Sequence, residues 1–119
     1  MRFQDLNLDE YRSDDDIQTI VERKLQLAIQ SCIDIANYII ARKRLHIPDE
    51  EANIFLVLAQ NDIIEKNLAR RMKGMVNFRN ILVHEYLGIY NQIVHDHLNE
   101  NLQDFDKFAK SIVDFLDSL

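Results

Sequence analysis

The fold is decided by residues 61–88, which have the sequence NDIIEKNLARRMKGMVNFRNILVHEYLG. Apolar residues recur in it at intervals of three and four, which predicts one long amphipathic helix from Asp62 to Gly88. Asp62 and Glu65 have the spacing of a capping box, and Gly88 suits the left-handed residue that often ends a helix. Gly74 in the interior predicts a close approach of another helix, because glycine otherwise weakens a helix. This stretch is therefore expected to be the central helix of the protein.

Four side chains able to do chemistry lie on the last two turns of this predicted helix: Arg79, Asn80, His84 and Tyr86. At about 100° per residue, Arg79 and Tyr86 project within about 20° of each other, while Asn80 and His84 share a face. His84 stands about 140° from Arg79 in an ideal helix. The four groups therefore converge only if the helix is distorted near its end, or if a second copy of the helix supplies the missing side.

The rest of the chain also has helical periodicity. It predicts helices over about residues 15–43, 49–59 and 89–116, with Pro48 in the connection after the first of them. Strict alternation of apolar and polar residues, the pattern of a half-buried strand, is absent from the sequence. We expect an all-α antiparallel bundle of about four helices, forming a single domain over residues 1–119.

Composition limits the class of protein. The 119 residues are 47% apolar and 29% charged, and no apolar run is long enough to span a membrane. With no basic and apolar leader either, the protein is expected in the cytoplasm. The net charge of -6 argues against binding nucleic acid by bulk electrostatics, so an RNA would be held locally. Two basic clusters, residues 42–44 and 70–73, either serve that purpose or form solvated helix faces.

Other reactive side chains have simpler interpretations. Cys32 is the sole cysteine and lies in an apolar run, which predicts a buried thiol. His95 and His97 are two residues apart and diverge on a helix, so they predict a solvated face and not a metal site. No metal or cofactor is expected. Asp34 lies within the apolar pattern of the first helix and needs a polar partner if buried, either as a brace for Arg79 or His84 or in a structural salt bridge.

The segment RNILVHEY at residues 79–86 resembles the R-x4-H-x-Y signature of the HepT-like branch of the HEPN superfamily, small all-helical ribonucleases of toxin–antitoxin loci. Supporting stretches follow the family's order at residues 28–40, 47–48 with 55–58, and 102–105. The resemblance spans residues 17–110. Family members usually begin with a further helix, which is expected to be missing or truncated here. Its loss would leave an apolar groove for a partner chain.

The resemblance implies a homodimeric, metal-independent endoribonuclease that cleaves RNA, such as tRNA or mRNA, in a site composed from two chains. Arg79 suits the phosphate because its planar fork matches two oxygens. His84 would transfer protons near neutral pH, with Asn80 orienting it or the phosphate and Asp34 in support. The resemblance also implies that a nucleotidyltransferase antitoxin of the MntA type transfers AMP to Tyr86 and so neutralises the toxin.

Two hypotheses of other classes stand beside this one. The first is a non-catalytic nucleotide- or substrate-binding subunit of a nucleotidyltransferase complex, which the acidic balance and the missing first helix favour. The second is a purely structural dimerisation domain, which leaves Arg79, His84 and Tyr86 unexplained. Cleavage of RNA in the absence of metal separates both of them from a ribonuclease.

Overall fold

The computed structural model describes residues 15–84 and 87–119, with side chains for residues 20–80 and 100–119. In these ranges the chain is helical and has no strand, which confirms the predicted all-α bundle. The second predicted helix is divided into a 3-10 turn and a short α-helix. The elements are α2 (Asp15–Lys43), η2 (Glu51–Asn53), α3 (Ile54–Gln60), α4 (Lys66–His84) and α5 (Leu87–Asp117).

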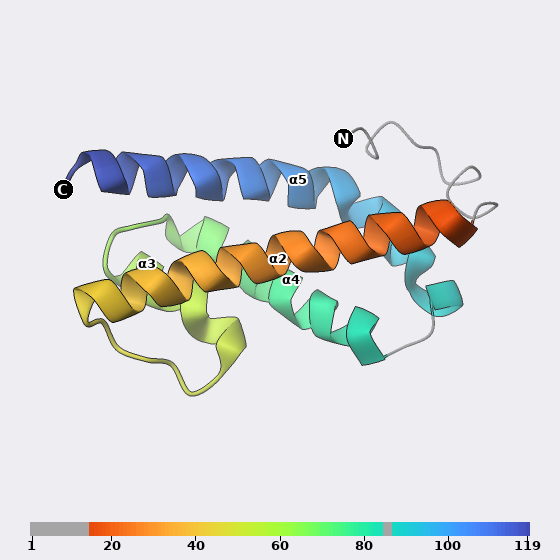
Figure 1. Cartoon of the computed structure of the whole chain (residues 1–119), viewed down its shortest axis with the longest axis horizontal. Helices are drawn as coiled ribbons and strands as arrows, with labels where there is room; N and C mark the ends of the chain where they lie inside the picture. Colours follow the sequence, from red (N-terminus) through yellow and green to blue (C-terminus); the bar gives the residue numbers. More distant parts are fainter. Residues whose placement is uncertain (1–14, 85–86) are drawn as a thin grey trace.

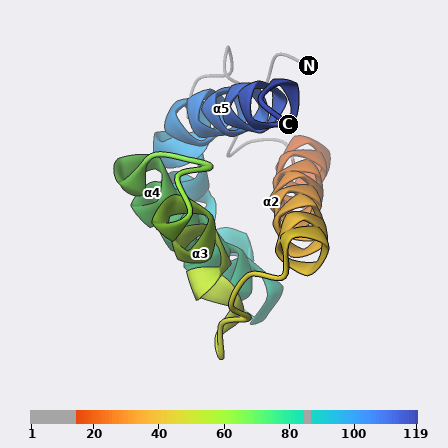
Figure 2. The ribbon, with the colours of Figure 1, turned by 90° about the vertical axis from the view of Figure 1, so that its left-hand side faces the viewer.

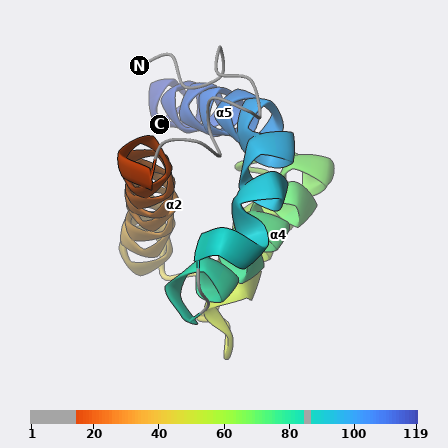
Figure 3. The same cartoon turned by 90° about the vertical axis from the view of Figure 1, so that its right-hand side faces the viewer.

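Three long helices enclose the core. Helix α4 runs opposite to both α2 and α5 (Figure 1), and the end-on view places α2, α5 and the pair of α3 and α4 around one centre (Figure 2). The end of α4 and the start of α2 lie at the same end of the bundle (Figures 1 and 3). The predicted truncation of a first helix falls on residues 1–14, outside the described part of the chain.

Apolar side chains recurring at threes and fours on α2 form one wall of the core. Those that are buried on α2 are Val21, Leu25, Ile29, Cys32, Ile33, Ala36, Ile39 and Ile40. An aromatic pair closes the centre, since the rings of Phe55 on α3 and Phe108 on α5 meet edge to face with centroids 5.5 Å apart. Met72 and Met75 of α4 are buried as well. The core thus joins α2, α3, α4 and α5, the α-helices of the described residues.

Helix α4 begins later than predicted, at Lys66. Asp62 has a φ of 60°, and its backbone N–H donates to the carbonyl of Ala59 at 3.1 Å. The N–H of Ile63 donates in the same way to the carbonyl of Leu58, at 3.0 Å. These bonds satisfy carbonyl groups at the end of α3, a position where Asp tolerates the left-handed conformation. The capping-box prediction is therefore wrong, because Asp62 ends α3 and does not open α4.

The two glycine predictions are also wrong. Helix α4 ends at His84 and α5 begins at Leu87, so Gly88 lies in the first turn of the next helix and not at a helix C-terminus. The chain therefore does not continue as one helix to Gly88. At Gly74 an added Cβ would meet no atom of the described residues within 4 Å, so no close helix approach among them requires this glycine.

One ion pair ties α4 to α5. The Nε of Arg71 lies 2.9 Å from Oδ1 of Asp104, whose side chain is buried. This contact shows that Arg71, a member of the basic cluster at residues 70–73, serves the fold. Burial raises the pKa of the Cys32 thiol to about 11, in agreement with its predicted role as a small apolar side chain.

An apolar hollow of about 460 Å³ lies between the C-terminal halves of α2 and α5. Its lining includes Ile35, Tyr38 and Leu116, all of them exposed. The groove expected from a truncated first helix stays a prediction, because residues 1–14 lie outside the described part of the chain. Among the described residues, no helix is long and apolar enough to cross a membrane.

Candidate functional site

Arg79 lies near the end of α4, with a side chain that is only 13% exposed. Its Nη1 donates a hydrogen bond of 2.8 Å to Oε1 of Gln30 on α2. Its Nη2 donates to Oδ1 of Asn80 at 2.8 Å and forms an ion pair with the carboxylate of Glu51 on η2. Side chains from three elements thus fix the guanidinium group, which orients its remaining N–H donors.

A second layer of contacts orients Gln30. The Nε2 of Gln30 donates to Oδ1 of Asp34 at 3.0 Å, one turn further along α2. Because the amide nitrogen is held by this carboxylate, the amide oxygen faces Arg79. Asp34 itself is exposed, so it does not carry the cost of a buried charge. Its predicted supporting role stays a prediction, and the structure places it one side chain away from Arg79.

Arg79 and Asn80 border a hollow of about 280 Å³ between α2 and α4, here called the arginine hollow. Four side chains of α2 line its other wall, at spacings of three and four that place them on one helix face. The residues of that wall are Arg23, Gln26, Leu27 and Gln30. The described part of the lining holds two guanidinium groups and three amides but no carboxylate, a composition that suits an anion with several oxygen acceptors.

Sequence patterns pointed to only part of this hollow. Arg79 and Asn80 were predicted, and the structure brings them together. Gln30 and Glu51 were not predicted as site residues, because the stretch at residues 28–40 supported only the family and Glu51 is 28 residues from Arg79 in sequence. The four-residue spacing of Gln30 and Asp34 on α2 was the one available indication of their contact.

His84 and Tyr86 complete the predicted set. His84 is the last residue of α4, five residues after Arg79 and thus about 7.5 Å further along the helix axis. The side chain of His84 and the whole of Tyr86 lie outside the described residues. Their convergence with Arg79 stays a prediction, and so do the surroundings of His95 and His97 on α5.

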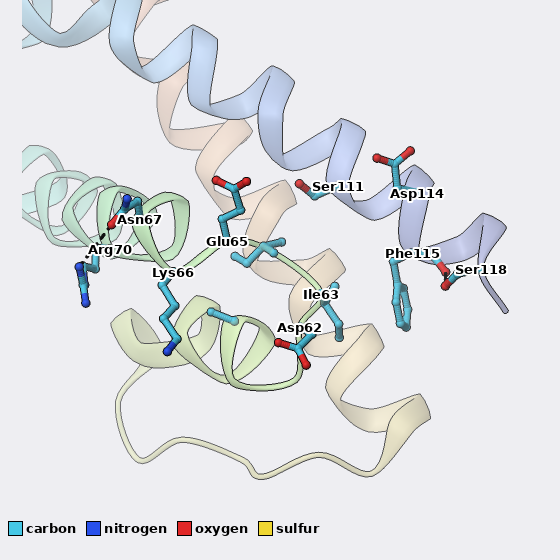
Figure 4. Close-up of a pocket in the computed structure, with 12 residues that line it drawn as sticks. Asp62, Ile63, Glu65, Lys66, Asn67, Arg70, Ser111, Asp114, Phe115 and Ser118 are labelled. Carbon is cyan, nitrogen blue, oxygen red and sulfur yellow. Dashed lines mark hydrogen bonds between the residues drawn. The ribbon is translucent and has the colours of Figure 1, made fainter.

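A larger hollow of about 750 Å³ lies elsewhere, between the start of α4 and the end of α5. Figure 4 shows Glu65, Lys66 and Arg70 on one side of it and Ser111, Asp114 and Ser118 on the other. Its charges are of both signs, which suits a polyanion less well than the arginine hollow does. Its Arg70 donates to Asn67 at 3.3 Å. In the part of the chain with described side chains, no group of His, Cys, Asp and Glu could hold a metal ion.

Comparison with known proteins gives a family and two named relatives. The family model for ribonucleases described as HepT-like matches residues 1–112 of the chain. The mRNA nuclease HepT of Shewanella oneidensis is 37% identical over 103 residues, which cover 87% of this chain and 77% of the relative. The tRNA nuclease HepT of Aphanizomenon flos-aquae is 30% identical over 118 residues, covering 99% of this chain and 80% of that protein.

Solved structures of toxins from toxin–antitoxin pairs have a similar fold. A crystal structure of a toxin–antitoxin with AMP-PNP superposes with a TM-score of 0.81 at 36% identity, over 87% of this chain and 78% of the other. The tri-AMPylated HEPN toxin of Shewanella oneidensis, in complex with its MNT antitoxin, gives 0.78 at 36% identity over 87% and 77%. The similarity therefore extends to both sequence and fold.

Proposed function

The chain belongs to the HepT-like ribonuclease family, and on this premise we propose that it is the RNA-cleaving toxin of a toxin–antitoxin pair, acting without a metal ion. The predicted family and the predicted class of enzyme are confirmed by the relatives. The observation that carries the proposal for this site is the oriented guanidinium group of Arg79 at a hollow lined, among the described residues, by cations and amides. We also propose that residues 1–119 form one domain, since α2 to α5 share one core.

Cleavage begins when the ribose 2′-OH attacks the adjacent phosphorus. The bond from phosphorus to the 5′-oxygen breaks, which leaves a 2′,3′-cyclic phosphate and a 5′-OH. Arg79 binds the phosphate oxygens and stabilises the negative charge that builds up on them. Asn80 helps to hold the Arg79 guanidinium through their mutual hydrogen bond. His84 takes a proton from the 2′-OH or gives one to the leaving oxygen.

A homodimer would complete this site. The arginine hollow is open to solvent, and Leu27 in its lining is 52% exposed. Ile20, two turns earlier on α2, is 46% exposed. Exposed apolar side chains beside a polar hollow favour burial by a second chain. A second copy placed there would also supply the imidazole that projects about 140° from Arg79 on the same helix.

An antitoxin that is a nucleotidyltransferase of the MntA type is the proposed partner. Solved structures hold related toxins in complex with an antitoxin, and one such toxin is tri-AMPylated. Tyr86, the last residue of the R-x4-H-x-Y signature, is the proposed acceptor of AMP. Phosphates added there would compete with RNA for Arg79. Intact-mass measurement after coexpression with the antitoxin should show gains in steps of one AMP, and Tyr86→Phe should abolish them.

The proposed activity is tested with purified protein, tRNA and EDTA. We expect cleavage to continue in EDTA and the new 3′ ends to carry 2′,3′-cyclic phosphate. Cleavage that stops in EDTA and returns with Mg²⁺, or that leaves 3′-OH ends, would contradict the mechanism. A non-catalytic subunit would cut RNA under neither condition.

A further inference from the structure

Arg23 is the second cation of the arginine hollow, and the proposed chemistry does not use it. It projects from α2 into the lining and is exposed. Within the described ranges, no hydrogen bond or ion pair engages its guanidinium group. Arg79, in contrast, is bound by Gln30, Glu51 and Asn80. The two arginines therefore differ in how readily they accept a ligand.

The charges of the hollow reinforce this difference. Glu51 compensates the charge of Arg79, whereas none of the lining residues with described side chains is a carboxylate that could compensate Arg23. The chain as a whole has a net charge of -6, so nonspecific attraction to RNA is weak. The uncompensated guanidinium group of Arg23, next to neutral amides, can therefore bind a phosphate in addition to the one at Arg79.

Arg23 on α2 and Arg79 on α4 lie along the same face of α2, because Arg79 is bound to Gln30 of that helix. Arg23 and Gln30 are seven residues apart, about 10 Å along the helix, and share a face. Gln30 holds the guanidinium group of Arg79, and the amide of Gln26 lies between the two turns in the same lining. A strand of RNA lying along this face would meet Arg79 with one phosphate and Arg23 with a neighbouring one.

We propose that Arg23 binds the RNA phosphate next to the one at Arg79, so that α2 forms a second phosphate subsite. The inference rests on the proposed ribonuclease function, which supplies the RNA and the role of Arg79. Arg23 acts in substrate binding and contributes to KM more than to kcat. Gln26 is placed to donate its amide N–H to the same strand.

Binding to an RNA that cannot be cleaved tests the subsite independently of catalysis. The probe is a fluorescein-labelled 2′-O-methyl oligonucleotide, which has no free 2′-OH, measured by anisotropy at several salt concentrations. We expect Arg23→Gln to weaken binding about fivefold and to reduce the slope of log affinity against log salt by about 0.7, the value for one phosphate contact. Lys24→Gln is the matched control, because Lys24 is the exposed neighbour of Arg23 and does not line the hollow.

A ligand with a single phosphodiester gives the sharper comparison. A dinucleoside monophosphate fills only the Arg79 position, so Arg23→Gln and Lys24→Gln should bind it equally, by competition with the probe. Equal binding of the longer oligonucleotide by both variants would overturn the subsite. The subsite would also be overturned if Arg23→Gln weakened binding of the dinucleotide as much as binding of the oligonucleotide. The same holds if the unsubstituted protein did not bind the oligonucleotide. Cleavage of the matching unmodified RNA is scored separately, so the failure of catalysis and the failure of the subsite are distinguishable.

Discussion

Glu51→Gln should make the protein less stable and its RNA affinity higher. The ion pair between Glu51 and Arg79 joins η2 to α4, and the two side chains are 47% and 13% exposed. Because solvent screens the exposed carboxylate, loss of the ion pair should lower the free energy of unfolding by about 1 kcal/mol. For a chain of this size that corresponds to a decrease in Tm of about 4 °C. The Gln30 and Asn80 contacts would still hold the guanidinium group.

The same carboxylate competes with phosphate for Arg79. Without its charge, RNA no longer has to displace an anion, and a gain of about 1 kcal/mol corresponds to about fivefold tighter binding. Thermal unfolding followed by circular dichroism gives Tm, and initial rates over a range of RNA concentrations give KM. Glu50→Gln is the control, since Glu50 is exposed and makes no side-chain capping bond at η2.

The diagnostic result for Glu51→Gln is a lower Tm together with a higher RNA affinity. If Glu51→Gln lowered both Tm and RNA affinity, the carboxylate would be part of the binding site and not a competitor. If neither quantity differed from those of Glu50→Gln, the ion pair would have no role in solution. Either outcome would refute the reasoning.

Three further substitutions test the fold. Arg71→Met deprives the buried carboxylate of Asp104 of its cation and should lower the free energy of unfolding by about 1–3 kcal/mol, measured by urea denaturation. The control Arg70→Met, at an exposed position, should lower it by less than about 0.5 kcal/mol. Phe108→Ala removes a side chain that is 1% exposed and should cost about 3–5 kcal/mol in the same assay. Burial raises the pKa of Cys32 from 9.0 to about 11, so the unfolded chain loses this proton first. Stability should therefore fall as pH rises from 9.0 to about 11, by at most about 3 kcal/mol, and Cys32→Ala should lack this part of the pH dependence.

Periodicity predicted the helices well and their ends poorly. The first helix was expected over about residues 15–43, and α2 has these limits because its apolar spacing persists along its whole length. The start of α4 was misplaced because Asp62 and Glu65 have capping-box spacing. Only the three-dimensional turn shows the backbone N–H of Asp62 bonded back to α3. Asp62 therefore belongs to the turn that ends α3 and does not cap the start of α4.

The candidate site was predictable where a motif marked it. Arg79 belongs to the signature, Asn80 is the next residue in the chain, and the two line the hollow together. Arg23, Gln30 and Glu51 could not be found in this way, because their relation to Arg79 arises from the packing of α2 and η2 against α4. Sequence spacing describes neighbours on one helix, whereas this hollow is built between helices.

Single-turnover cleavage of tRNA in EDTA tests most directly the claim that Arg79 stabilises the reacting phosphate. The comparison is between the unsubstituted protein, Arg79→Gln and the exposed control Arg70→Gln, each with its helical content verified by circular dichroism. We predict that Arg79→Gln is slower by at least about 100-fold while Arg70→Gln is unchanged. Cleavage by Arg79→Gln within about threefold of the unsubstituted rate would contradict the claim, because a lost contact in the transition state cannot leave the rate intact.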